Sequence, residues 1–190
     1  DMLAWYKFDG DLSDSSGNGK DLTGGTGTSF IDNSAIGTKS ISFPKLTGQE
    51  LSSTVDLSNN ISFSISLWIY RDITDQIEYI VSTEYIGEKY RNLALGYYRN
   101  MFRFSFWGFG IDTAETFPND VDKWVHWTCT YNSTNRSIKT YRNGVLVASA
   151  NAAQDTNFGT KIIIGDRNGN LSGCKIDDLR VYNRELTIDE

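Results

Sequence analysis

One histidine and two cysteines are the side chains of this sequence best suited to general-base or nucleophilic chemistry. His126 lies between two tryptophans, where a structural hydrogen bond is the expected role. Neither Cys129 nor Cys174 has a general-base partner in its sequence context, and no Gly-x-Ser-x-Gly elbow or phosphate-binding loop occurs. The cysteines are either small buried apolar residues or a disulfide. These residues predict no catalytic centre.

Oxygen-bearing side chains alternate in one N-terminal segment, and this pattern is suited to calcium. Asp14, Ser16 and Asn18 alternate along the chain, and Gly19 follows where a sharp bend would be needed. Calcium takes about six to eight oxygen ligands, and an EF-hand loop begins in this way. The second half of such a loop is missing, because Gly25 stands where a bidentate glutamate is required. The segment is a candidate cation loop but not an EF-hand.

A period-two alternation of apolar and polar residues predicts the strands that must position these groups. In residues 61–70 the odd positions are Ile, Phe, Ile, Leu and Ile, whereas the even positions are Ser, Ser, Ser, Trp and Tyr. In residues 101–107, Phe102, Phe104 and Phe106 point one way and the residues between them the other. Asn143-Gly144 separates two strand-like runs and suits a type I′ hairpin turn.

Further strand-like runs are spread over the whole chain, at residues 3–8, 40–43, 78–82, 93–97, 124–131, 138–142, 145–150, 161–165 and 175–182. No window sustains a helical repeat over three turns. Many short strands joined by polar turns predict an all-β sandwich of two antiparallel sheets. No repeat or linker divides the chain, so residues 1–190 are expected to form a single domain. Its abrupt start on a strand-like segment suggests a domain excised from a longer protein.

The charge of the chain limits its partners. The net charge is −6, and no basic stripe compensates for it locally. Such a surface repels phosphate backbones, which argues against a nucleic-acid partner. No apolar run approaches the ~20 residues that a membrane helix needs, so no membrane insertion is expected. Glycosylation sequons favour an extracellular location, and they begin at Asn60, Asn132, Asn135 and Asn170.

Several short motifs occur in order along the chain. The first is Trp5-Tyr6-Lys7-Phe8-Asp9-Gly10, followed by Asp14-Ser15-Ser16-Gly17-Asn18-Gly19 and by Ile65-Ser66-Leu67-Trp68-Ile69. Trp124-Val125-His126-Trp127 then leads to Tyr141-Arg142-Asn143-Gly144, and residues 176–187 read Ile-Asp-Asp-Leu-Arg-Val-Tyr-Asn-Arg-Glu-Leu-Thr. In order and spacing these motifs resemble the laminin G-like (concanavalin A-like) jelly-roll modules, over nearly the whole chain. The resemblance implies a jelly-roll sandwich.

The resemblance also implies a structural calcium ion, because the first and last strands of such modules lie close together. The implied ligands are Asp9, Asp14, Asn18, Asp177 and Asp178. Clustered carboxylates repel one another unless a cation or an arginine neutralises them. The alternative is that Asp14 and Asp177 accept backbone N–H groups in turns and pair with Arg180 or Arg184.

Glycoside hydrolases and polysaccharide lyases also occur on the concanavalin-type sandwich, so catalysis has to be considered. Retaining hydrolases of this type carry Glu-x-Asp-x-x-Glu, which holds two carboxyl groups about 5 Å apart. That string is absent. Jelly-roll lyases use a histidine and a tyrosine beside an arginine or glutamine, and His126 is the sole histidine. We expect no enzymatic activity, and a jelly-roll hydrolase or lyase is kept as the second alternative.

Sugar recognition needs aromatic faces for stacking and planar polar groups for paired hydroxyls. If the three phenylalanines of residues 101–107 fill the core, then Arg103 and Trp107 lie on the opposite face. The segment 79–109 is therefore the predicted ligand surface. Its candidate contacts, with one arginine from the preceding strand, are Trp107, Arg103, Tyr85, Tyr90, Tyr98 and Arg71. Trp5 and Trp68 are assigned to the core instead.

The function predicted from the sequence is that of a non-catalytic, lectin-like carbohydrate-binding module with a structural calcium ion. Its expected partner is a glycan or polysaccharide. The first alternative is a protein-binding adhesion module of an extracellular or virion surface protein, in which an exposed apolar patch replaces a sugar-shaped groove. In either case the expected location is extracellular, on a cell surface or on a virion surface, as a module of a larger chain.

Overall fold

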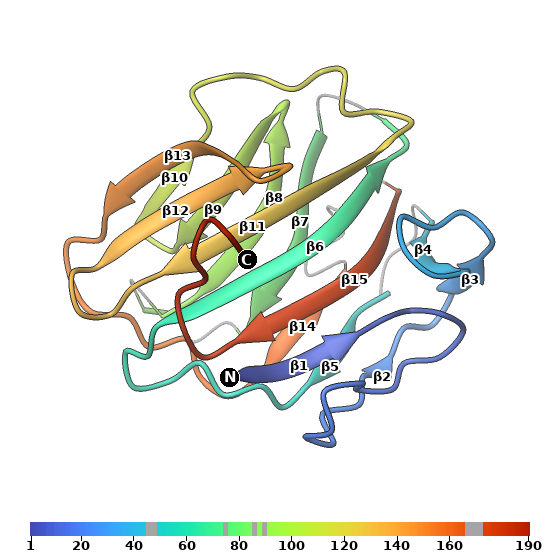
Figure 1. Cartoon of the computed structure of the whole chain (residues 1–190), viewed down its shortest axis with the longest axis horizontal. Coiled ribbons are helices and arrows are strands. Elements are labelled where there is room, and N and C mark those ends of the chain that lie inside the picture. Colours follow the sequence, from blue (N-terminus) through green and yellow to red (C-terminus); the bar gives the residue numbers. More distant parts are fainter. Residues whose placement is uncertain (45–48, 74–75, 85–86, 89–90, 166–172) are drawn as a thin grey trace.

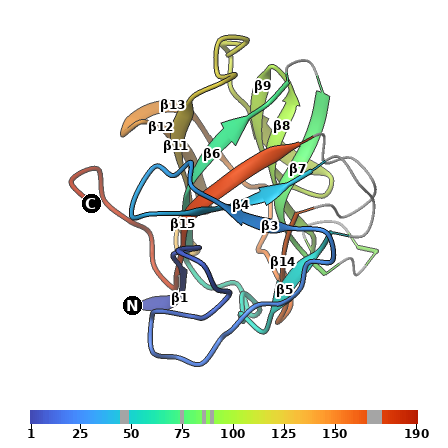
Figure 2. The same ribbon diagram turned by 90° about the vertical axis from the view of Figure 1, so that its right-hand side faces the viewer.

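Two antiparallel sheets packed face to face make up the computed structural model of this protein (Figures 1 and 2). The structure describes residues 1–44, 49–73, 76–84, 87–88, 91–165 and 173–190. Both ends of the chain lie on the side of the larger sheet. The described residues form no helix, and accordingly none that is long and apolar enough to cross a membrane. The predicted all-β sandwich is confirmed.

The larger sheet has eight strands in the order β13-β12-β11-β6-β15-β4-β3, with β1 paired to β15. The long strands β6 and β15 lie at its centre and are flanked by β11. Its strands are β1 (Met2–Tyr6), β3 (Ser29–Ile31), β4 (Ser40–Phe43), β6 (Phe63–Arg71), β11 (Trp124–Tyr131), β12 (Ser137–Arg142), β13 (Val145–Asn151) and β15 (Cys174–Tyr182).

The smaller sheet has seven strands in the order β10-β9-β8-β7-β14-β5-β2. Its strands are β2 (Thr23–Gly24), β5 (Leu51–Ser53), β7 (Gln76–Thr83), β8 (Leu93–Arg99), β9 (Met101–Phe106), β10 (Phe109–Asp112) and β14 (Ile162–Ile164). The turn between β12 and β13 has φ 48° at Asn143 and φ 77° at Gly144, as the predicted type I′ hairpin requires.

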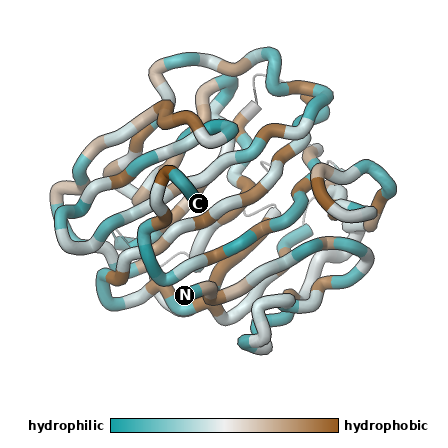
Figure 3. Tube along the Cα trace, viewed as in Figure 1, coloured by the Kyte–Doolittle hydropathy of each residue, from teal (hydrophilic) through white to brown (hydrophobic). Residues whose placement is uncertain are grey.

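The inner faces of the two sheets meet in one hydrophobic core. Phe102, Phe104 and Phe106 are buried in it, as the alternation predicts. Trp127 of β11 stacks on Phe102 of β9, with 3.8 Å between ring centroids and 7° between planes. Such aromatic pairs add about 0.5–1.5 kcal/mol beyond the area they bury. Figure 3 shows the corresponding alternation of apolar and polar residues along the strands of the larger sheet.

Two tryptophans assigned to the core lie elsewhere. Trp5 and Trp68 are only half-buried, and the fully buried residues beside them are Tyr6 and Leu67. The side chains of a strand alternate between faces, so the neighbours of buried residues point away from the core. Both tryptophans therefore belong to the outer face of the larger sheet.

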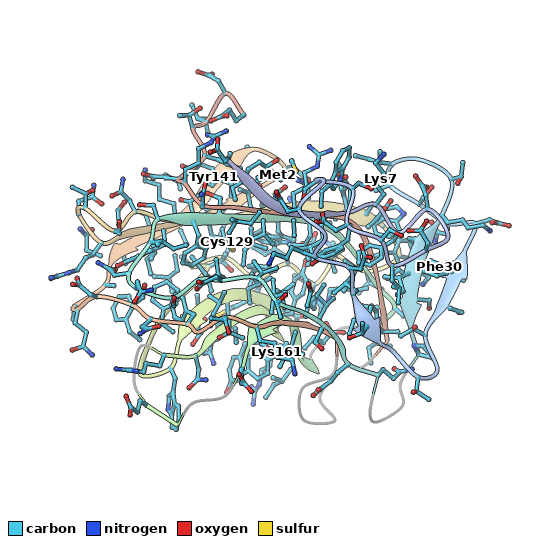
Figure 4. The ribbon with its side chains drawn as sticks, turned by 90° about the horizontal axis from the view of Figure 1, so that it is seen from below. Met2, Lys7, Phe30, Cys129, Tyr141 and Lys161 are labelled. Atoms are coloured by element: carbon cyan, nitrogen blue, oxygen red, sulfur yellow. The ribbon has the colours of Figure 1, made fainter. Side chains whose placement is uncertain are left out.

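The two cysteines are free thiols buried on different strands, so the disulfide alternative is wrong. Cys129 is on β11 and Cys174 is on β15, with β6 between these strands. Figure 4 shows Cys129 between the two sheets. Burial raises the pKa of both thiols, which keeps them protonated and unreactive.

Arg71 was predicted to contact the ligand, and the structure shows that this prediction is wrong. Its side chain, at the end of β6, is fully buried, and its Nε donates to Glu78 Oε2 at 2.7 Å. Its Nη2 donates to the carbonyl oxygen of Arg99 at 3.1 Å, and its guanidinium lies 3.9 Å from the ring centroid of Tyr97. Arg71 therefore joins the two sheets inside the sandwich and is inaccessible to a ligand at the surface.

We expect Arg71→Ala to lower the free energy of unfolding by about 3–5 kcal/mol, because it leaves the buried Glu78 carboxylate without its guanidinium. The matched control is Arg136→Ala, which removes an exposed ion pair with Asp155 of the same 2.7 Å N–O distance and should cost at most about 1 kcal/mol. Chemical denaturation of the three proteins measures both values. Equal losses in the two variants would contradict the role assigned to Arg71.

Candidate functional site

The outer face of the larger sheet carries aromatic and polar side chains from neighbouring strands. In β6 the residues that alternate with the core side chains are Ser64, Ser66, Trp68 and Tyr70, of which the two serines are also buried. The register of β6 and β11 places His126 opposite Trp68 and Trp124 opposite Tyr70. The rings of the first pair lie 5.0 Å apart and those of the second 5.5 Å apart, centroid to centroid. Two strands thus carry two cross-strand aromatic pairs on this face.

A β-bulge in β15 adds charged groups to this face. The pairing with β6 shifts between Asp177 and Arg180, and Asp178 has φ 47° within the shift. A bulge re-aims side chains that regular alternation would send to opposite faces. Here it brings both carboxylates to the outer side of the sheet, where Asp177 contacts the backbone of residues 35–36 and Asp178 contacts Arg180.

A cavity of about 430 Å³ lies on this face. The sheet supplies its base, the loop of residues 33–39 reaches it through Ile36, and residues 186–190 form another wall. In Figure 1 the C-terminal segment crosses in front of the sheet, and in Figure 2 it stands on the same outer side. Figure 4 shows Tyr141 on this side as well. The polar and aromatic sheet residues that line the cavity include Ser66, Trp68, His126, Tyr141, Asp178 and Arg180.

The C-terminal wall is fixed to the sheet by hydrogen bonds. Ser64 Oγ donates to the carbonyl oxygen of Arg184 at 2.8 Å and accepts from the Leu186 N–H at 2.9 Å. Glu185 accepts from Lys139 Nζ and from Asn132 Nδ2, each at 2.7 Å. These contacts explain why Ser64 is buried although it faces outward.

A second cavity of about 380 Å³ adjoins the first, and four residues line it: Trp68, Trp124, His126 and Asn143. Trp68 and His126 line both cavities. The pair therefore separates two depressions on one sheet face. Concave sites of this size, with aromatic walls and few polar groups, are typical of small-molecule binding.

The charges beside the larger cavity are paired. Arg180 donates through Nε to Asp178 Oδ1 at 3.2 Å and has Nη2 3.0 Å from Asp178 Oδ2. Asp178 Oδ1 also accepts from Trp5 Nε1 at 2.7 Å. Burial lowers the pKa of His126, whose Nε2 lies 2.9 Å from Ser66 Oγ. The histidine is therefore neutral at neutral pH and is hydrogen-bonded, as its sequence context predicts.

The remaining residues of the predicted ligand surface lie on the smaller sheet. Arg103 points outward from β9, where its Nε donates to Asp112 Oδ1 at 2.7 Å and its guanidinium lies 3.9 Å from the Tyr98 ring centroid. Trp107, in the turn after β9, is 40% exposed. The structure thus brings Arg103 and Tyr98 together. Tyr85 and Tyr90 lie outside the described residues.

Three of the implied calcium ligands are occupied by other contacts. Asp14 accepts four hydrogen bonds, from the N–H groups of Trp5, Ser16 and Lys20 and from the Ser16 hydroxyl. Asn18 donates through Nδ2 to the carbonyl oxygens of residues 2 and 3. Asp178 pairs with Arg180, an arginine that the alternative interpretation had paired with Asp14 or Asp177. These contacts fit a cation poorly, because both carboxylate oxygens of Asp14 already accept hydrogen bonds.

The other two implied ligands hold the loop of residues 33–39. Asp9 Oδ1 accepts from the N–H groups of Thr38 and Lys39 at 2.7 and 3.1 Å. Asp177 Oδ2 accepts from the N–H groups of residues 35 and 36 at 2.8 and 2.9 Å. Asp177 Oδ1 is buried and has no hydrogen-bond partner within the described part of the chain. Such an oxygen fits a cation well.

Burial raises the pKa of Asp177 to about 6, which shows the cost of an ionised carboxylate at this place. Among the described side chains, no three His, Cys, Asp or Glu residues gather into a metal cluster. A cation beside Asp177 would therefore need backbone carbonyl oxygens or water in addition to the carboxylates.

The sequence alone did not single out the outer face of the larger sheet as a candidate site. The sequence of residues 61–70 does indicate this face, because Trp68 and Tyr70 are at even-numbered positions, as are three serines. An aromatic residue on a polar face has no core to fill. The contribution of β15 was harder to find, since the bulge at Asp178 changes the parity of the strand.

Several solved structures share this fold. The binding domain of Paraclostridial Mosquitocidal Protein 1 has a TM-score of 0.80 and 19% identity, covering 99% of this chain and 50% of that one. The botulinum neurotoxin serotype G binding domain has a TM-score of 0.79 and 18% identity, covering 100% and 49%. The chain thus spans about half the length of these toxin domains.

Domain 4 of AbnA, a GH43 extracellular arabinanase from Geobacillus stearothermophilus, is similar over almost its full length. Its structure, a complex with arabinotriose, has a TM-score of 0.76 and 22% identity, covering 99% of this chain and 95% of that one. At such identities these likenesses show the fold. The two toxin structures are described as binding domains, and the arabinanase domain as a complex with arabinotriose.

No curated protein sequence matches the chain. A family model does match it, over residues 45–190, and its description is "Concanavalin A-like lectin/glucanases superfamily" (Laminin_G_3). This match covers most of the chain and agrees with the sandwich described above, so the resemblance to laminin G-like jelly rolls is confirmed. The chain belongs to the concanavalin A-like lectin/glucanase superfamily.

Proposed function

We propose that this domain is a non-catalytic carbohydrate-binding module and that the sugar binds on the outer face of the larger sheet. The observation that carries the proposal is the cavity of about 430 Å³ in which half-buried Trp68 lies beside the polar groups of Ser66, Asp178 and Arg180. Aromatic rings stack on the apolar side of a sugar, and planar polar groups receive its hydroxyls. This face offers both.

The comparisons support a binding role. The similar arabinanase domain is described in complex with arabinotriose, and the similar toxin domains are described as binding domains. The arabinanase is described as extracellular. By analogy, we place this module outside the cell or on a cell or virion surface, as part of a larger chain that it brings to a glycan.

Two alternatives rest on specific observations. His126, Tyr141 and Arg180 line one cavity, and a lyase needs a base, an acid and a cation of these types. Arg180 is already neutralised by Asp178, so binding without cleavage is favoured. An adhesion module would instead use Val145 and Leu146, which are 64% and 48% exposed at the start of β13. Unsaturated sugar products would favour the lyase.

We expect Trp68→Ala to weaken oligosaccharide binding at least about tenfold, which equals about 1.4 kcal/mol, because it removes the ring shared by both cavities. The matched control is Trp107→Ala, which removes an exposed tryptophan near the smaller sheet and should leave affinity unchanged. An array of oligosaccharides that includes arabinotriose identifies a ligand, and calorimetry compares the variants. A loss confined to Trp107→Ala would move the site to the smaller sheet.

We further propose that calcium binds at Asp177, with Asp9 on the other side of the loop of residues 33–39. The support is the buried Asp177 oxygen without a partner, next to a loop that two carboxylates already hold. Bound calcium would supply positive charge to the Asp177 carboxylate, which burial makes costly to ionise. Since Ile36 lines the larger cavity, the ion would also fix one wall of the sugar site.

Calcium is expected to raise the unfolding temperature of the wild type and chelator to lower it, whereas Asp177→Asn should respond to neither. Asp14→Asn is the matched control, and it should be less stable yet retain the calcium response, because the Asp14 carboxylate accepts its hydrogen bonds from Trp5 of β1 and from its own loop. Thermal unfolding with calcium or chelator measures this. The reverse pattern, with Asp14→Asn unresponsive and Asp177→Asn responsive, would disprove the assignment.

The pH dependence in chelator is a further test of Asp177. Its pKa is about 6 in the folded protein and about 3.8 without burial, so the folded state holds the proton more tightly. The wild type therefore loses stability relative to Asp177→Asn as the pH rises between these values. Above that range the difference should be constant. Adding calcium should remove most of this stability difference between the wild type and Asp177→Asn.

A further inference from the structure

We propose that the sugar bound at this site is an uncharged oligosaccharide chain, which crosses Trp68 and His126 and presents hydroxyl groups to the Asp178–Arg180 pair. The inference rests on the proposed function and specifies the ligand class of the same site. It follows from the charges beside the larger cavity, the hydrogen-bonding capacity of the pair and the presence of two adjoining cavities.

The described residues that line the larger cavity offer no unpaired cation to an acidic sugar. Of the described residues that line it, Arg180 is the one with a permanent positive charge, and Asp178 neutralises it. The other lining charges are negative, from Asp189 and Glu190, and the second of these pairs with Arg184. His126 is neutral at neutral pH. A uronate or sulfate group would therefore lose hydration without gaining a free cation.

The Asp178–Arg180 pair can still bind hydroxyl groups. A guanidinium has five N–H donors in one plane, and the contacts to Asp178 use Nε and Nη2. The Arg180 side chain is 33% exposed, whereas that of Asp178 is 8% exposed. The remaining Nη donors can thus reach neighbouring hydroxyls of a sugar ring, while the carboxylate holds the guanidinium in place. Charge-assisted bonds of this kind are the stronger ones.

Two cavities on either side of one aromatic pair indicate a chain and not a single sugar. The cavities have about 430 and 380 Å³ and share only Trp68 and His126. Trp124 and Asn143 line the smaller cavity and do not line the larger one. One sugar unit in each cavity would place the connecting bond beside the Trp68–His126 pair.

The decisive variant is Asp178→Asn, which should free Arg180 for an acidic sugar. Asparagine tolerates the φ of 47° at this position and can still accept from Trp5 Nε1. The matched control is Asp112→Asn, which frees Arg103 beside Tyr98 on the smaller sheet. Both changes remove one carboxylate from an arginine pair and alter the net charge equally.

The probes are xylotriose and trigalacturonate, measured by calorimetry with xylose and xylobiose for chain length. Wild type should bind the uncharged trisaccharide at least about tenfold more tightly than the acidic one, with little effect of salt, and more tightly than the monosaccharide. Asp178→Asn should reduce this preference about tenfold, and Asp112→Asn should retain it. Circular dichroism confirms that both variants are folded.

Tighter binding of trigalacturonate by the wild type would overturn the inference and leave the proposed function intact. Equal binding of xylose and xylotriose would overturn the two-cavity part of it. A shift of preference in Asp112→Asn and not in Asp178→Asn would also overturn it, since the ligand would then lie on the smaller sheet. If the wild type binds neither these probes nor any sugar of a broad array, the proposed function itself fails.

Discussion

Consecutive side chains of a β-strand point to opposite faces, and β6 lies near the middle of the larger sheet, where both faces of a strand are used. Its inward residues contact the core, and Arg71 at its end forms the ion pair that joins the two sheets. Its outward residues meet their counterparts on β11 and provide Trp68 for the proposed sugar site. The same alternation therefore builds the core and the site, and a shift of one residue would destroy both.

Irregular backbone adds what alternation alone does not provide. The bulge in β15 brings Asp177 and Asp178 to one side of the sheet, where the first holds the loop of residues 33–39 and the second holds Arg180. The loop carries Ile36 to the larger cavity. One local departure from strand geometry thus links the calcium proposal, the shape of the cavity and its polar groups, although these involve segments far apart in the sequence.

Alternation and turn residues were enough to predict the sandwich, its core phenylalanines and the hairpin at Asn143. The alternation along β6 also carried information that was not used in the prediction. Arg71 is at an odd-numbered position, like the inward-facing residues of the strand, whereas Trp68 is at an even-numbered one. The ligand surface was expected on one continuous segment. The cavity instead combines β6, β11, β15 and the C-terminal wall, and their pairing depends on long-range register that local patterns do not encode.

The central claim, that sugar binds on the outer face of the larger sheet, can be tested with the five tryptophans as internal probes. Their indole N–H signals can be followed by nuclear magnetic resonance while an oligosaccharide is added. The signals of Trp68 and Trp124 should move with ligand concentration, whereas those of buried Trp127 and of Trp107 should stay in place. Movement of the Trp107 signal with Trp68 and Trp124 unchanged would contradict it.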